Sequence, residues 1–282
     1  MIPAILGIVG SVLTQPEREL FRASPPRGVI LFGRNIKNKT QLSDLTADLR
    51  ASLPAGAVLM VDQEGGRVAR LKPPHWPALP AAGTLASSAA AYAHGLTLGR
   101  LVHEAGFDIT TAPVLDLRLP GASDVIGDRA LNADPAIVAR LGGEVARGLM
   151  EAGITPVMKH LPGHGRARVD SHVALPRVPA LTEDDLLPFI ANRHLPWAMT
   201  AHVVFENFDA LRPATLSPMV IREIIRGRIG FTGTLVSDDL AMGALSGTPA
   251  ERAKAALAAG CDIALYCPGD MAGNRAILDA LA

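Results

Sequence analysis

One stretch of the chain concentrates side chains that can move protons and hold polar ligands. The stretch "KHLPGHGRARVDSH" (159–172) is interrupted by a proline and two glycines and contains Lys159, His160, His164, Asp170 and His172. A histidine beside a carboxylate titrates near neutral pH, so it can serve first as a general acid and then as a general base. Asp170 lies two residues before His172, which is close enough to hydrogen-bond its ring. The proline and glycines predict a bent, hinged loop that can move over a bound ligand.

Other polar side chains follow short apolar runs of the sequence. They are Asp62, Asp116, Arg118, His202, Asp238 and Asp239, with Arg70 and Arg129 in the loops beyond. Each of them alone has an ordinary structural explanation, such as capping a helix, bonding within the core or lying on the surface. An unpaired ammonium at Lys159, after a buried run, would be costly, which favours a function there. Polar side chains at the ends of several apolar runs together indicate one site.

Three kinds of chemistry compete for this set. A metal hydrolase would use His160, His164, His202 and Asp238 as ligands, but no early His-x-His pair is present, and Pro-Gly separates the first two histidines. Acyl transfer by a serine lacks its Gly-x-Ser-x-Gly turn. Glycoside cleavage needs an anionic nucleophile, a proton donor and groups that hold hydroxyls. Asp238 would be the anion, the loop would supply the donor, and the sugar would be held by Asp62, Arg70, Arg129, Lys159 and His160.

Eight apolar runs, each followed by a helical pattern or loop, must position these residues. The runs cover 4–10, 28–33, 57–62, 107–116, 154–160, 197–203, 233–239 and 261–267. The helix at 134–153 has Asp134 as its expected cap and Gly153 at its end. Alternating strands and helices imply parallel pairing, and eight units predict an α/β fold of the single (β/α)8 TIM-barrel type, with the active site at the C-terminal ends of the strands. An open doubly wound sheet is the alternative, although no dinucleotide fingerprint follows the first run.

Composition limits the classes of protein. The chain has 282 residues, 49% hydrophobic and only 4% aromatic, so aliphatic side chains must fill the core. A net charge of zero without a basic block argues against a nucleic-acid partner. No apolar run is long enough for a membrane span, and the N-terminus lacks the charged region and cleavage site of a signal peptide. Cys261 and Cys267 suggest buried thiols in a reducing compartment. We expect one catalytic domain over residues 1–282, located in the cytoplasm.

Three motifs resemble a known family. "VDQEGGRVARL" (61–71), "KHLPGHGRARVDSH" (159–172) and "VSDDLAM" (236–242) are similar to motifs of the NagZ-type β-N-acetylglucosaminidases of glycoside hydrolase family 3. The family pattern Lys-His-Phe-Pro-Gly-His-Gly, four residues, then Asp-Ser-His is matched in order and spacing. "AHVVF" (201–205) and "IGDRALNADP" (126–135) fit as well, so the resemblance covers nearly the whole chain. Leu161 and Ala241 depart mildly from the family's usual Phe and Ser, and the segment between Pro176 and Trp197 looks short.

The resemblance implies a (β/α)8 barrel that hydrolyses terminal, non-reducing β-linked N-acetylglucosamine with retention of configuration. It implies a role in peptidoglycan recycling in the bacterial cytoplasm, on N-acetylglucosaminyl-1,6-anhydro-muramic acid fragments. The family nucleophile corresponds to Asp238 rather than Asp239, and the acid/base to His172 with Asp170 as its partner. The family's sugar-binding positions correspond to Asp62, Arg70, Arg129, Lys159 and His160.

The expected partner is therefore a small sugar, with no metal or organic cofactor, no nucleic acid and no membrane, in a monomer or weak homo-oligomer. Two alternatives stay open. A histidine acid/base does not repel an anion as a carboxylate would, so phosphate could replace water and make the protein a phosphorylase. The barrel could also bind sugar without catalysis, although the intact Asp170, His172 and Asp238 argue against this.

Overall fold

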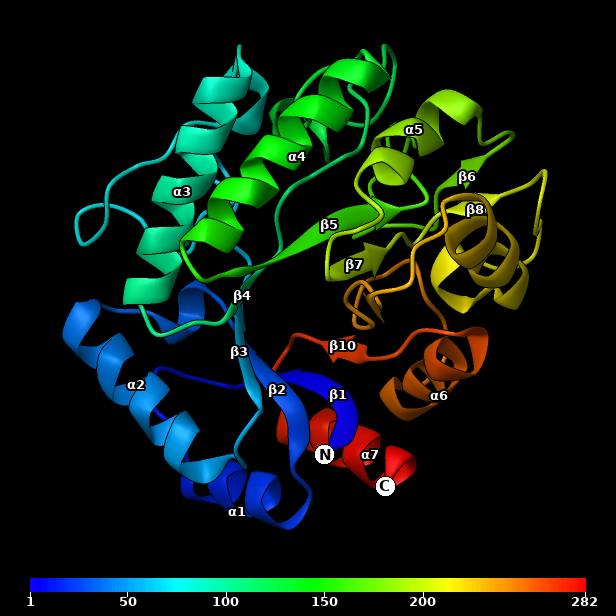
Figure 1. Cartoon of the computed structure of the whole chain (residues 1–282). Helices are drawn as coiled ribbons and strands as arrows, with labels where there is room; N and C mark the ends of the chain where they lie inside the picture. Colours follow the sequence, from blue (N-terminus) through cyan, green and yellow to red (C-terminus); the bar gives the residue numbers. More distant parts are fainter.

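Eight parallel strands form a barrel in the computed structural model, which describes all residues 1–282 (Figure 1). Their order is β10-β1-β2-β3-β4-β5-β7-β9. The ends of this row meet between β9 and β10, where Val236 pairs with Ile263 in parallel and Ser237 N donates to Ile263 O at 3.0 Å. The predicted barrel is therefore confirmed and the open sheet is excluded. The strands are β1 (Ile2–Gly7), β2 (Pro26–Leu31), β3 (Val58–Val61), β4 (Ile109–Thr110), β5 (Thr155–Leu161), β7 (Trp197–Thr200), β9 (Thr234–Val236) and β10 (Ala264–Tyr266).

A helix follows each barrel strand and packs outside it (Figure 1). Local sequence signals set the helix ends: Asp134 Oδ1 accepts the N–H groups of Ala136 and Ile137, and Gly260 ends α6 in the left-handed region at φ 116°. The helices are α1 (Gln15–Ala23), α2 (Lys39–Ser52), α3 (Ser88–Glu104), α4 (Pro135–Glu151), α5 (Glu183–Ala191), the π-helical segment Val220–Arg228, α6 (Pro249–Ala259) and α7 (Met271–Leu281). Short 3-10 turns occupy Gly33–Asn35, Ala82–Thr84, Gly127–Arg129 and Ala214–Leu216.

Two apolar layers hold the barrel together. Successive residues of a strand face opposite sides, so one set points into the barrel and the other toward the helices. The barrel interior is filled by a compact cluster in which every strand or its immediate flank takes part: Ile5, Ile30, Met60, Ile109, Val157, Trp197, Met199, Val236, Ile263, Leu265 and Cys267. A larger layer of mainly aliphatic side chains lies between strands and helices. The filled interior leaves only the ends of the barrel open to a ligand.

The structure differs from the sequence prediction in three places. The predicted strand 107–116 is regular only over Ile109–Thr110, and beyond it a single bridge joins Val114 to Lys159. The helical pattern after the run 197–203 forms a π-helix over Val220–Arg228, with Ile229 N donating to the carbonyl of Ile224, five residues back. A small parallel ladder of β6 (Arg177–Val178) and β8 (Val204–Phe205) was not predicted. This ladder fixes the chain just after the loop that carries His172.

Two expectations about the chain as a whole can be compared with the structure. Cys261 and Cys267 are both buried, as expected. No helix combines the length and the apolar character that crossing a membrane requires.

Candidate active site

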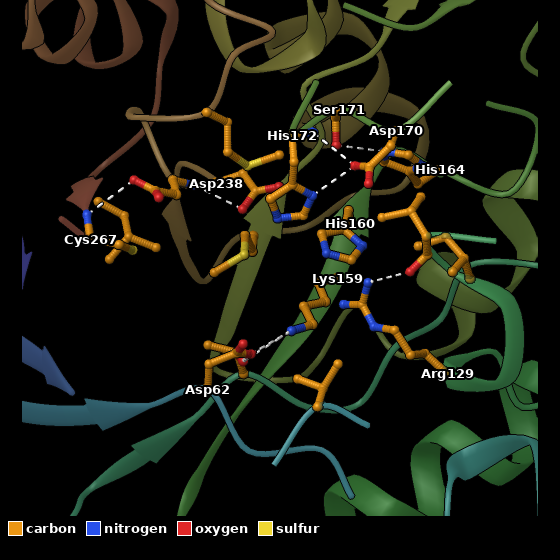
Figure 2. A pocket seen from close by; sticks show the side chains of 18 of the residues that line it. Asp62, Arg129, Lys159, His160, His164, Asp170, Ser171, His172, Asp238 and Cys267 are labelled. Carbon is orange, nitrogen blue, oxygen red and sulfur yellow. Dashed lines mark hydrogen bonds and ion pairs between the residues drawn. The ribbon is translucent and has the colours of Figure 1, made fainter. Parts of the chain in front are cut away.

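A cavity of about 610 Å³ lies at the C-terminal end of the barrel and is shown in Figure 2. Side chains from the ends of β3, β5 and β9 and from the loops beyond them form its wall. All eight residues that the sequence singled out as catalytic or sugar-binding line it: Asp62, Arg70, Arg129, Lys159, His160, Asp170, His172 and Asp238. Barrel closure thus brings together residues that are up to 176 positions apart in the chain, as the positions of Asp62 and Asp238 show.

Asp62, directly after β3, is held by two cations. Its Oδ1 lies 3.1 Å from Lys159 Nζ and its Oδ2 lies 2.6 Å from Arg70 Nη2, while Thr111 donates a hydrogen bond to Oδ1. Burial alone would raise the pKa of Asp62, but Lys159 and Arg70 outweigh it and hold that pKa well below its usual value. Asp62 is therefore ionised and does not cap a helix. Arg70 Nε is buried without a protein partner, whereas the side chain as a whole is 28% exposed and lines the cavity.

Glu64 is a member of this cluster that the sequence analysis missed. Its carboxylate accepts two bonds from Arg129, at 2.9 Å from Nε and 2.8 Å from Nη2, and lies 2.5 Å from Lys159 Nζ. Burial opposes ionisation of Glu64, but Lys159 and Arg129 lower its pKa. The sequence contained a signal for it, since Glu64 follows Asp62 by two residues, and in the structure both carboxylates contact Lys159 Nζ. Glu64 holds both cations at the cavity wall.

His160 is oriented by Asp116. Its Nδ1 lies 2.6 Å from Asp116 Oδ2, and the other oxygen of that carboxylate accepts the main-chain N–H of His164 at 2.7 Å. Burial would raise the pKa of Asp116, yet His160 lowers it, so the carboxylate is an acceptor and His160 Nδ1 must carry the proton. Nε2 of His160 is left for the cavity. Asp116, one of the run-end carboxylates, thus supports His160 rather than capping a helix.

Asp170 and His172 form a close pair on the exposed loop after β5. Asp170 Oδ1 accepts from His172 Nδ1 at 2.7 Å and from its main-chain N–H at 2.8 Å. Burial alone would raise the pKa of Asp170, but the hydrogen bonds from His172 outweigh it and lower that pKa below its usual value. Because the carboxylate only accepts, Nδ1 carries a proton and Nε2 is the atom that can exchange one with a ligand. The His172 side chain is 63% exposed, but it still lines the cavity that contains Asp238.

Asp238 and Asp239, after β9, have different surroundings. Asp239 Oδ1 accepts the main-chain N–H groups of Ala241 and Cys267, and burial raises its pKa. The carboxylate of Asp238 accepts only from the N–H of Asp239. Burial opposes its ionisation, but His202, His160 and Lys159 lower its pKa. Asp238 is therefore an anion with free lone pairs, whereas Asp239 fastens the end of β9 to β10.

The sequence as a whole can now be compared with known proteins. Residues 6–282 match the model of the glycosyl hydrolase family 3 N-terminal domain. The chain belongs to glycoside hydrolase family 3. It is a glycoside hydrolase, and the resemblance drawn from its motifs is confirmed at the level of the family.

Several relatives of this family 3 enzyme resemble it over most of their length. A β-hexosaminidase of Alkalilimnicola ehrlichii is 42% identical over 282 residues, covering 94% of this chain and 80% of that protein. One from Bordetella avium is 38% identical with the same coverage. The crystal structure of NagZ from Neisseria gonorrhoeae in complex with N-trifluoroacetyl-D-glucosamine superposes with a TM-score of 0.91 at 35% identity, covering 99% of this chain and 85% of that chain.

The geometry also bears on the metal-hydrolase alternative for this family 3 chain. His202 was one of its four candidate ligands, yet its Nδ1 is 2.8 Å from Thr215 Oγ1 and its Nε2 is 2.9 Å from the carbonyl of Asp239. Both ring nitrogens are thus occupied, and burial lowers the pKa of this histidine. His202 is a hydrogen-bonded core residue that braces the main chain beside Asp238.

Proposed function

We propose that this family 3 enzyme is a retaining exo-β-N-acetylglucosaminidase that removes terminal β-linked N-acetylglucosamine. The observation that carries the proposal is that the Asp170–His172 pair and the free carboxylate of Asp238 line one cavity with a cluster of ionised groups. A nucleophilic carboxylate and a proton donor on the walls of one cavity are the requirement of double displacement. The names of the relatives, β-hexosaminidases, agree with this substrate class.

In the proposed reaction Asp238 attacks the anomeric carbon while His172 Nε2–H protonates the leaving oxygen. The bond to the aglycone breaks and a glycosyl ester of Asp238 forms. Neutral His172 then takes a proton from water, whose oxygen attacks the anomeric carbon and releases Asp238. The Asp170 carboxylate stabilises the imidazolium in the first step through its bond to Nδ1. Two inversions give overall retention.

The sugar would be held by the opposite wall of the cavity. Asp62 is an ionised acceptor, His160 lines the cavity with Nδ1 bonded to Asp116 and Nε2 left free, and the partly exposed Arg70 side chain lines the same cavity. Together with Lys159 and Arg129 they offer donors and acceptors to the hydroxyl and acetamido groups. All of these residues come from one chain, so we further propose that residues 1–282 act as one catalytic domain. The resemblance supports peptidoglycan recycling in the bacterial cytoplasm, on N-acetylglucosaminyl-1,6-anhydro-muramic acid fragments, as its role.

The test is release of 4-nitrophenol from its β-N-acetylglucosaminide and its β-glucoside, with and without phosphate and EDTA. We expect cleavage of the N-acetyl substrate alone, with N-acetylglucosamine as product in phosphate, and the β-anomer formed first by NMR. Asp238→Ala should lose essentially all activity and His172→Ala most of it, whereas Asp48→Ala, on an exposed aspartate, should match wild type.

Other outcomes would lead elsewhere. N-acetylglucosamine 1-phosphate as the main product would make the enzyme a phosphorylase. Loss of activity in EDTA, restored by a metal ion, would contradict the metal-free mechanism. A folded wild type that binds N-acetylglucosamine but cleaves neither glycoside would point to a sugar-binding barrel.

A further inference from the structure

The loop that carries His172 is anchored at Ser171. Between residues 168 and 175 Ser171 is the one buried residue, at 2% exposure, while its neighbour Val173 is 76% exposed. Its hydroxyl forms a 3.2 Å hydrogen bond with Nε2 of His164, which is itself buried and held through its main-chain N–H by Asp116 (Figure 2). A single inward side chain therefore ties the exposed loop to the barrel.

The state of His164 suits this contact. Burial lowers the pKa of His164 to about 4, so the ring is neutral at pH 7. A neutral imidazole offers one donor and one acceptor, and a serine hydroxyl can pair with either. Its Nδ1 is buried without a protein partner, so the bond to Ser171 is the one that the ring makes with the protein. This points to an anchoring role for His164.

A second contact holds the same loop from the side of the nucleophile. Gly243 lies on the loop after β9, which also contains Asp238. A Cβ added to Gly243 would lie 2.8 Å from the carbonyl oxygen of His172 and 3.2 Å from that of Val173. The backbone of Gly243 is not in the left-handed region, so alanine fits its conformation and only the loop opposes it. The main chains of the two loops touch here because residue 243 has no side chain.

The turn between these contacts is built as one unit. Asp170 O accepts the N–H groups of Val173 and Ala174 at 3.0 and 3.1 Å, and its carboxylate accepts from the main-chain N–H and the ring Nδ1 of His172. Such a turn moves as a body, so fixing it at Ser171 and at the carbonyl of His172 also fixes the imidazole. Neither contact includes Asp62, Lys159 or another member of the ionised cluster.

We propose that Ser171 and Gly243 are positioning residues, which hold the His172 turn over the cavity for proton transfer and play no part in sugar binding. The inference rests on the proposed acid/base role of His172. A neutral hydrogen bond contributes about 0.5–1.5 kcal/mol, which corresponds to roughly a 2- to 12-fold change in the equilibrium between the His172 turn held over the cavity and the same turn released from it. Ser171→Ala should lower kcat by that factor with KM almost unchanged. Gly243→Ala should lower it further, because the carbonyl of His172 must move away.

The experiment compares two substrates. With the 4-nitrophenyl glycoside, both steps use His172. With the 2,4-dinitrophenyl glycoside and azide, the leaving group needs no acid and the entering nucleophile needs no base. Ser171→Ala and Gly243→Ala should therefore be slower than wild type with the 4-nitrophenyl glycoside in water. With the 2,4-dinitrophenyl glycoside and azide they should reach the wild-type rate, with glycosyl azide as product. Gly10→Ala is the matched control, since nothing lies within 4 Å of a Cβ at that position.

The outcomes separate this inference from the proposed function, because His172→Ala is measured beside the two variants. If azide rescues His172→Ala while Ser171→Ala and Gly243→Ala behave as wild type on both substrates, the positioning inference is overturned and the acid/base role stands. Equal losses on both substrates, without rescue, would also overturn it, since they would indicate a damaged sugar site. If His172→Ala is not rescued, both ideas fall. Circular dichroism checks folding, and Ser171→Ala decides alone if Gly243→Ala does not fold.

Discussion

The substitution Glu64→Gln tests the interpretation that Glu64 compensates buried positive charge at the cavity wall. Asp62 and Glu64 face three cations, Lys159, Arg70 and Arg129, and the substitution leaves one carboxylate against three. Two unit charges 2.8 Å apart, the distance from Arg129 Nη2 to Glu64 Oε1, attract by about 6 kcal/mol at an effective dielectric constant of about 20. Desolvation offsets part of that energy.

The expected loss of stability follows from the contacts that glutamine can still make at position 64. Glutamine keeps the shape and one acceptor oxygen but turns an N–H group toward a cation. Removing one partner of a buried ion pair costs about 3–5 kcal/mol, and Glu64 is 5% exposed. In a domain of this size about 1 kcal/mol moves Tm by roughly 2–4 °C, so we expect a drop on the order of 10 °C. KM should also rise, because Lys159 and Arg129 lose their fixed positions.

The matched control is Glu144→Gln. Glu144 lies 2.6 Å from Arg147 on the surface of α4, with 29% and 55% of the two side chains exposed. A solvated pair of this kind contributes about 0–1 kcal/mol, so its Tm should stay within a few degrees of wild type. Thermal unfolding followed by circular dichroism measures both variants. A Glu64→Gln protein as stable as Glu144→Gln would refute the view that Glu64 compensates buried cations.

Two further predictions concern His160, near the end of β5, and His164, in the loop after it. The folded pKa of His164 is lowered to about 4 and its unfolded value is about 6.5, so the unfolded chain binds more protons between these values. The stability that depends on this group is therefore fully present above pH 6.5 and is lost as the pH falls toward 4, by about 3 kcal/mol in all. Urea unfolding at several pH values in that range should show that the free energy of unfolding of His164→Asn changes less steeply with pH than that of wild type. An unchanged dependence on pH would contradict the neutral state assigned to His164. Asp116→Asn removes the charged acceptor of His160, so initial rates should show KM raised roughly tenfold, the loss of one charge-assisted bond, with a smaller change in kcat; an unchanged KM would show that this bond does not orient His160.

Much of the fold was predictable because local rules govern it. Apolar runs alternated with capped helical patterns, and Asp134 caps α4 as its sequence position predicted. The placement of Asp62, Lys159 and Asp238 at one cavity followed from parallel pairing, which puts the C-terminal ends of all strands at the same end of the barrel. The short β4 and the π-helical Val220–Arg228 were not predicted, since apolar pattern alone does not reveal where backbone pairing stops or changes its hydrogen-bond step.

The sequence by itself indicated to which family the chain belongs and placed Asp62, Lys159 and Asp238 at the mouth of the barrel. Only the tertiary structure decided their partners. Glu64 meets Arg129, which lies 65 positions away on the 3-10 turn Gly127–Arg129, and Asp116, in the connection after β4, meets His160, 44 positions away near the end of β5. His202 looked like Lys159 in the sequence, as a polar residue at a strand end, but its ring turned into the core toward Thr215. The alternation of side chains along a strand determines on which face of the strand a residue lies. Which residues of different segments meet depends on how the barrel closes, and no local pattern of the sequence contains that information.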